Sequence, residues 1–215
     1  MPVSKVLFSK GLSVSSKAIT GTAEHSTSSS LAATATRTAD RFISKLKVPR
    51  TKVTTPEEAR TLISNLEKSN YAQPTQIPEG LLDKWLVGKS GHFQLNGDVV
   101  EFQKTTPMIG TGNKGSKMYK IIDSKTGKVK QRIICTNNRP TQAFDIDPNT
   151  GTELKRTTWT DGSNKPSRIT TFDIESGDYI TLNFTSSGKI IEVKNTLATT
   201  GRQVPICENP DIKLL

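Results

Sequence analysis

The chain has 215 residues, which is enough for one ordinary domain with appendages or for two small domains. Only 33% of the residues are hydrophobic, and no stretch approaches the roughly 18 consecutive apolar residues of a membrane-spanning helix. The net charge of +10 is uneven, because residues 1–50 carry +6 and the remainder only +4. Such a mild excess in the remainder disfavours a specific nucleic-acid-binding protein.

Residues 1–50 form a tail rich in small polar residues. They include ten Ser and six Thr, a composition that buries too little apolar surface to offset the entropy lost on ordering. We therefore expect a disordered tail. Within it, residues 31–47 have the spacing of an amphipathic helix, with apolar and basic positions on separate faces. The residues of this helix expected to contact a membrane or a chaperone are Arg37, Arg41, Phe42, Lys45 and Leu46.

A helical lead-in is expected over residues 51–88. Thr55 is a good N-cap, Pro56 suits the first helical position, and the pair Glu57-Glu58 complements the helix dipole. The apolar side of this helix is supplied by Leu62, Ile63 and Leu66. A second short helix is predicted after Pro78, in the segment EGLLDKWLV.

From His92 onward the hydrophobic period changes to two, which indicates β-strands. Asn96-Gly97 lies between two such runs and predicts a hairpin with a type I′ turn, since both central residues of that turn need positive φ. Further strand-like runs cover residues 117–122, 128–136, 142–146, 153–159, 168–174, 179–184 and 189–195. Residues 89–200 are therefore predicted to form an all-β domain, an antiparallel meander or small barrel of about eight or nine strands. Residues 201–215 are expected to be a C-terminal extension.

The turns between these runs repeat. Asp123 to Gly127 and Asp147 to Gly151 share the form D-x-x-T-G, 24 residues apart. Asp can accept backbone N–H bonds and Gly can take the left-handed conformation, so each segment predicts a hairpin turn. The pattern indicates repeated strand–turn units that are too irregular for a named repeat family.

Two short motifs fit loops better than ligand sites. Gly110 to Gly115 matches G-x-G-x-x-G, but it lacks the strand-to-helix context of a phosphate-binding loop, so we expect a mobile loop between strands. Asp145-x-Asp147-x-Asn149 has the spacing of a calcium loop, but Thr150 and Arg156 stand where glycine and glutamate are needed. A hairpin turn is the favoured interpretation there.

No nucleophilic or metal site emerges from the sequence. His92, Cys135 and Cys207 could form a thiol–imidazole site, but no local signature supports one. Cys135 alternates with Ile133, as a small core residue would. No closely spaced pair of ligands predicts zinc. Catalytic residues stay unknown, and we expect no metal and no cofactor.

The strongest charge pattern is the basic segment from Lys114 to Arg132, which contains seven Lys and Arg against one acid. Strict alternation along its second strand places Lys128, Lys130 and Arg132 on one face, with Lys120 of the preceding strand as a neighbour. These four residues are the predicted anion-binding set, able to hold phosphates of an anionic surface. The alternative is a solvated outer face that keeps the sheet soluble.

Residues 1–50 resemble the secretion signals of type III effectors, which Gram-negative pathogens inject into host cells. The resemblance rests on Val3 at the third position, the absence of any acid before Glu24, and a serine content of one residue in five. It implies a secreted virulence effector that acts in the host cytoplasm, with a secretion chaperone for the N-terminal region. It implies nothing about the activity of residues 51–215.

Other interpretations of the tail stay open. An organellar transit peptide is also basic and Ser-rich, although here the first arginine is Arg37. An ordinary disordered tail of a cytoplasmic protein and a viral structural or accessory protein are further alternatives.

For the β domain we expect binding of a host protein or an anionic membrane surface, and neither catalysis nor specific nucleic-acid recognition. The alternative to a binding function is an enzyme whose active site is assembled from residues scattered over the sheet. A flat open sheet would favour the interaction module, and an enclosed polar cavity would favour the enzyme or a ligand carrier.

Overall fold

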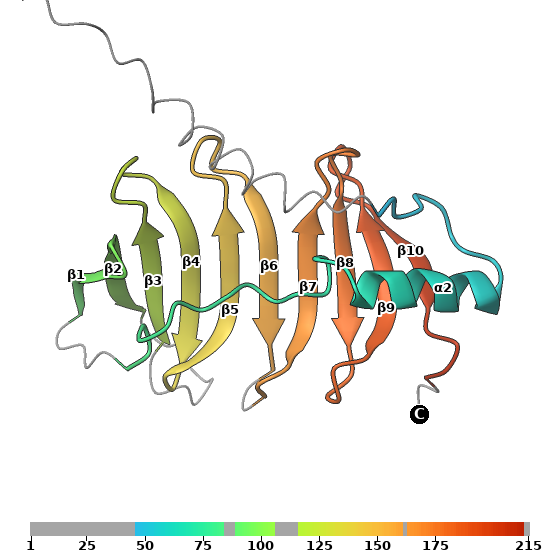
Figure 1. Ribbon diagram of the computed structural model, residues 1–215, viewed down its shortest axis with the longest axis horizontal. Helices are drawn as coiled ribbons and strands as arrows, with labels where there is room; N and C mark the ends of the chain where they lie inside the picture. Colours follow the sequence, from blue (N-terminus) through green and yellow to red (C-terminus); the bar gives the residue numbers. More distant parts are fainter. Residues whose placement is uncertain (1–45, 84–88, 106–115, 161–162, 213–215) are drawn as a thin grey trace, which may run out of the picture. The chain divides into compact units, whose positions relative to one another are not determined.

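A computed structural model describes residues 46–83, 89–105, 116–160 and 163–212, all within the unit Arg41–Leu215. The fold is mostly β, a single antiparallel sheet in which each strand pairs with its neighbours in sequence (Figure 1). The strands are β1 (Ser90–Leu95), β2 (Asp98–Thr105), β3 (Ser116–Ile122), β4 (Val129–Thr136), β5 (Arg139–Ile146), β6 (Glu153–Trp159), β7 (Pro166–Phe172), β8 (Tyr179–Phe184), β9 (Ile190–Thr196) and β10 (Gln203–Glu208).

The sheet is open. Within the described residues, ten strands run in order from β1 to β10 and no pair closes the sheet, so the meander is confirmed, the barrel alternative is wrong, and the strand count is slightly higher than predicted. The additional strand is β10, which pairs with β9 and carries the sheet past the predicted boundary at residue 200. Pro205 is tolerated within β10 because this is an edge strand, where one missing N–H removes no central ladder bond.

Repeated hairpin turns connect the strands at one of their two ends, and we call this end of the sheet the turn edge. Asn96 and Gly97 have φ values of 52° and 85°, as the predicted type I′ turn requires. The two D-x-x-T-G segments belong to a set of four longer turns, in which the glycine N–H donates to the first residue's carbonyl over 2.7–2.8 Å. The four turns are Asp123–Gly127, Asp147–Gly151, Asp173–Gly177 and Leu197–Gly201.

Helix α2 (Pro56–Glu67) begins where the sequence predicts. The Thr55 side chain accepts a hydrogen bond from the Glu58 N–H, and Pro56 occupies the first turn. The buried side of the helix consists of Ala59, Leu62, Ile63 and Leu66. It packs on residues of β8, β9 and β10, such as Leu182, Val193 and Ile206, in the first of two hydrophobic clusters.

After α2 the chain continues as a strap, residues 68–83, which crosses the same face of the sheet towards β3 (Figure 1). The helix predicted after Pro78 is wrong over its described part, because residues 78–83 form turns. Gly80 has a φ of 75°, a left-handed conformation that interrupts an α-helix. Leu81 lies in the second hydrophobic cluster, with Val100, Tyr119, Ile133 and other side chains of β2 to β6.

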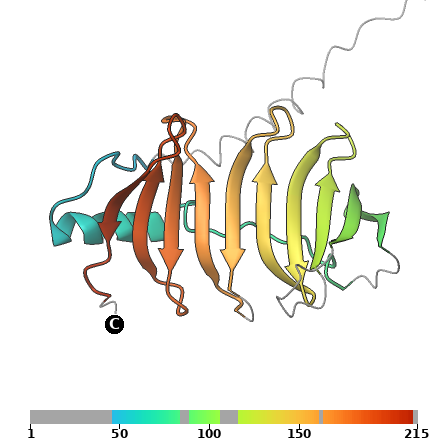
Figure 2. The same cartoon turned by 180° about the vertical axis from the view of Figure 1, so that it is seen from behind.

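The two faces of the sheet therefore differ. Helix α2 and the strap cover one face of the sheet, which we call the covered face. No other described element covers the opposite face, which we call the open face (Figure 2). Side chains alternate along a strand, so residues between the core positions point to the open face. Among the described residues, no helix is long and apolar enough to cross a membrane.

Candidate functional site

A β-bulge divides the predicted anion-binding residues between the two faces. Ile121 pairs with Gln131 while Ile122 pairs with Val129, so Lys130 is an extra residue in β4. The Lys130 ammonium lies 2.7 Å from the carboxylate of Asp98 and, with Gln131, lines a groove on the covered face. The prediction that Lys130 shares a face with Lys128 and Arg132 is therefore wrong.

The other three predicted residues come together on the open face. Lys120 and Arg132 are cross-strand partners, and Lys128 lies just before β4. All three line a surface hollow of about 380 Å³, which we call the cationic hollow. Its remaining lining residues are Val129, Ile146, Pro148 and Gly151. No carboxylate lines the hollow, and its three cations make no ion pair with any described residue.

An aromatic ring held between two guanidinium groups adjoins the cationic hollow. Arg132, Phe144 and Arg156 are consecutive cross-strand partners on β4, β5 and β6. The guanidinium carbons of Arg132 and Arg156 lie 4.4 and 5.1 Å from the centre of the Phe144 ring, which is a cation–π geometry. Phe144 is only 5% exposed although it lies on the open face, because the two arginine side chains cover it.

The two arginines differ in their charge partners. Arg156 forms two contacts with the carboxylate of Glu153, at 2.8 and 3.0 Å. The Nε of Arg132 is buried and has no hydrogen-bond partner among the described residues. Arg132 therefore keeps an uncompensated positive charge that is fixed in orientation by stacking. This stack was missed in the sequence, where Phe144 and Arg156 stand in different strands with no local pattern to join them.

A carboxylate beside the cationic hollow, that of Asp147, interacts with one of its cations, and Glu101 is the cross-strand partner of another, Lys120. Asp147 caps its own turn, accepting hydrogen bonds from the Asn149 N–H at 2.8 Å and the Thr150 hydroxyl at 2.9 Å. These hydrogen bonds, with a smaller contribution from the charge of Lys128, hold the pKa of Asp147 below its ordinary value. The calcium-like spacing around Asp147 is thus a hairpin turn, as the sequence favours.

On the covered face, polar side chains of three neighbouring strands bind the strap. Gln131 donates to the Gln76 carbonyl at 2.8 Å, and Asp145 accepts from the Thr75 hydroxyl at 3.0 Å. Lys155 donates to the carbonyls of Asn70 and Gln73, at 2.7 and 3.1 Å. The Thr157 hydroxyl also accepts a hydrogen bond from the Thr75 N–H. We call the four sheet residues Gln131, Asp145, Lys155 and Thr157 the clasp.

Burial affects both charged members of the clasp. Desolvation raises the pKa of Asp145 and lowers the pKa of Lys155, and each charge opposes the shift of the other because the two residues are cross-strand partners. A second bulge follows this pair, since Ile146 pairs with Glu153 and leaves Leu154 as the extra residue. The clasp is a structural connection between strap and sheet, which the sequence did not reveal because its members are far apart in the chain.

The structure separates the residues considered for nucleophilic catalysis. Cys135 and Cys207 are buried in different hydrophobic clusters, and His92 is exposed on the edge strand β1. Burial raises the pKa of the Cys135 thiol to about 12 and that of Cys207 to about 11, so neither is a thiolate near neutral pH. Cys135 is a core residue, as predicted. No group of three or more His, Cys, Asp or Glu side chains in the described ranges is placed to hold a metal ion.

Several predicted features fall outside the described residues. They include Arg37, Arg41, Phe42 and Lys45 of the tail and the glycine-rich segment from Gly110 to Gly115. Leu46 and Lys47, the last residues of the predicted 31–47 helix, have no regular secondary structure. Leu46 packs against the hydrophobic cluster beneath α2, so this partly buried side chain contributes to the core of the fold.

No family model and no curated protein matches the chain. Among solved structures, it is similar to a mutant of S. aureus TarM in complex with fondaparinux, alpha-GlcNAc-glycerol and UDP. The TM-score is 0.31 at 11% sequence identity, and the similarity covers 77% of this chain but only 32% of the TarM chain. A likeness at this TM-score assigns no function.

Proposed function

We propose that the β domain is a binding module that holds an anionic membrane surface against its open face. The observation that carries this proposal is the cationic hollow, where Lys120, Lys128 and Arg132 converge without a lining carboxylate. An open single sheet with one uncovered face offers a broad contact surface. The arginine–phenylalanine stack keeps Arg132 oriented, which reduces the entropy lost on binding.

The proposed contact is electrostatic and modest in strength. Exposed cations near an anionic bilayer contribute about 1 kcal/mol each, and their reach falls as salt screens them. Three such residues would give at most about 3 kcal/mol, or roughly a hundredfold in affinity, because Lys120 and Arg132 are only partly exposed. Binding should therefore weaken strongly between low and physiological salt.

Co-sedimentation with vesicles of anionic lipid tests this proposal. The variant Lys120→Glu/Lys128→Glu/Arg132→Glu should lose most of its binding, together with most of the salt dependence. The matched control reverses three exposed lysines that do not line the hollow, Lys52, Lys68 and Lys89, and should bind nearly as well as the wild type. Equal loss in both variants would show that only net charge matters and would refute a site on the open face.

We further propose that residues 1–50 direct export by a type III secretion system, so that the module reaches the host cytoplasm as an effector. The composition of the tail supports this proposal: no acid precedes Glu24, and one residue in five is serine. A reporter fused to residues 1–50 should be secreted by a strain that carries such a system. Secretion of residues 51–215 alone at the wild-type level would refute it.

A further inference from the structure

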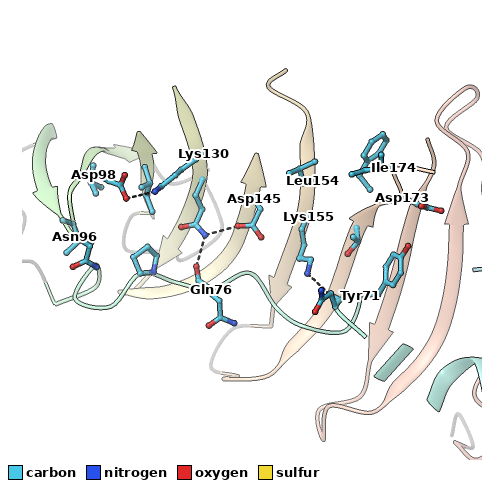
Figure 3. A pocket seen from close by; sticks show the side chains of 18 of the residues that line it. Tyr71, Gln76, Asn96, Asp98, Lys130, Asp145, Leu154, Lys155, Asp173 and Ile174 are labelled. Atoms are coloured by element: carbon cyan, nitrogen blue, oxygen red, sulfur yellow. Dashed lines mark hydrogen bonds and ion pairs between the residues drawn. The ribbon is translucent and has the colours of Figure 1, made fainter. Parts of the chain in front are cut away.

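The covered face carries a groove of about 610 Å³ that is separate from the cationic hollow. It lies between the strap and the turn edge, with Tyr71 and Gln76 on the strap side and Asp98, Leu154 and Ile174 on the side of the turns (Figure 3). We propose that this groove binds an extended peptide segment of a partner protein, in which a basic side chain is flanked by aliphatic side chains. The proposal is independent of the function proposed for the open face.

Apolar side chains collect on the side of the groove next to the turns. Leu154 is the extra residue of the second bulge and lines the groove beside its neighbour Lys155. Phe172 and Ile174 line it from the end of β7 and the following turn. Ile174 is 63% exposed. Among the described residues it is the one large hydrophobic residue classed as exposed. Aliphatic side chains of a ligand would remove this surface from water.

The repeated turns show that Ile174 is not required by the turn itself. The four longer turns share their backbone hydrogen bonds, so their second and third positions can be compared directly. The other three turns place Ser124-Lys125, Pro148-Asn149 and Ala198-Thr199 where this turn has Ile174-Glu175. Only the turn that borders the groove on this side therefore carries a large aliphatic residue followed by a carboxylate.

The charge of the groove indicates a cationic ligand. Of the described residues that line it, four carry carboxylates, Asp98, Asp145, Asp173 and Glu175, against the two ammonium groups of Lys130 and Lys155. Lys130 is paired with Asp98, and Lys155 donates to strap carbonyls, which leaves the lip formed by Asp173 and Glu175 negative. Burial raises the pKa of Tyr71 to about 12, and the charges of these two carboxylates contribute to the shift.

The lining of the groove fits a peptide as the occupant. The residues that line it are spread along the strap, from Tyr71 to Gln76 (Figure 3). Its volume of about 610 Å³ lies within the usual range of ligand-binding pockets. Aliphatic side chains of the peptide would contact Leu154, Phe172 and Ile174, while the basic side chain would lie at Asp173 and Glu175.

The test selects hexapeptides from a random displayed library on the immobilised full chain and measures the affinity of a selected synthetic peptide. Selected sequences should place Lys or Arg beside Leu, Ile or Val. The variant Ile174→Ser/Glu175→Lys should bind the peptide at least about tenfold more weakly. The matched variant Ala198→Ser/Thr199→Lys introduces the same two residues at equivalent exposed positions of the last turn and should bind normally. Circular dichroism of both variants checks that they fold.

Three outcomes would overturn the proposal. The first is no enrichment above uncoated support, or enrichment of acidic or purely polar sequences. The second is equal binding by the two variants. The third is a dimer in sedimentation that Ile174→Ser/Glu175→Lys dissociates, because this would assign the groove to a second copy of the chain. The variant reversed at Lys120, Lys128 and Arg132 should keep its peptide affinity, so that failure of either proposal is seen separately.

Discussion

Replacing Lys155 by alanine is expected to lower the free energy of unfolding by about 1.5–3 kcal/mol, because it removes a buried ammonium group that donates two hydrogen bonds to the strap. The side chain is 7% exposed and holds two strap carbonyls, at 2.7 and 3.1 Å. Without it, both carbonyls lose a donor and the partly buried carboxylate of Asp145 loses a nearby positive charge. Urea denaturation measures the loss, with the exposed Lys189→Ala as the control that should change stability little.

A double variant measures how strongly the charges of Asp145 and Lys155 interact, apart from the other contacts of the clasp. In Asp145→Asn/Lys155→Ala no carboxylate is left without the nearby charge of Lys155, so the loss should be smaller than the sum of the two single losses. Additive losses would mean that the two charges do not interact. A loss for Lys155→Ala no greater than that for Lys189→Ala would mean that the strap is not held by the clasp.

Leu81→Ala is expected to cost about 2–5 kcal/mol, the usual range for truncating a fully buried leucine. Leu81 is 0% exposed in the hydrophobic cluster of β2 to β6, whereas its neighbour Leu82 is only partly buried against the same cluster. Leu82→Ala is therefore the matched control and should cost clearly less, measured by the same urea titrations. Equal losses at the two positions would contradict the placement of the end of the strap.

Local signals predicted most of the fold. The alternation in each strand, the Asn96-Gly97 turn and the capping residues Thr55 and Pro56 act over a few residues, so they can be read directly from the chain. Strand β10 was missed because it contains Pro205 and owes its pairing to β9 rather than to its own composition. Gly80 explains why an apparently helical segment forms turns instead.

The candidate site was predictable only in part, for a physical reason. Lys120, Lys128 and Arg132 converge as alternation predicts, but the bulge that turns Lys130 to the other face depends on how β4 pairs with β3. A strand that reads as strictly alternating carries no local mark of such an insertion. The clasp and the groove depend on contacts between the strap and distant strands, and these have no signature within any one segment.

Vesicle affinity of two single variants tests the central claim most directly, since Lys128 and Lys130 lie two residues apart but on opposite faces. Lys128→Gln removes a cation of the hollow and should weaken binding to anionic vesicles about fivefold at low salt. Lys130→Gln removes the same charge from the covered face and should leave the affinity unchanged. Equal weakening by both substitutions, or a larger effect of Lys130→Gln, would contradict binding through the open face.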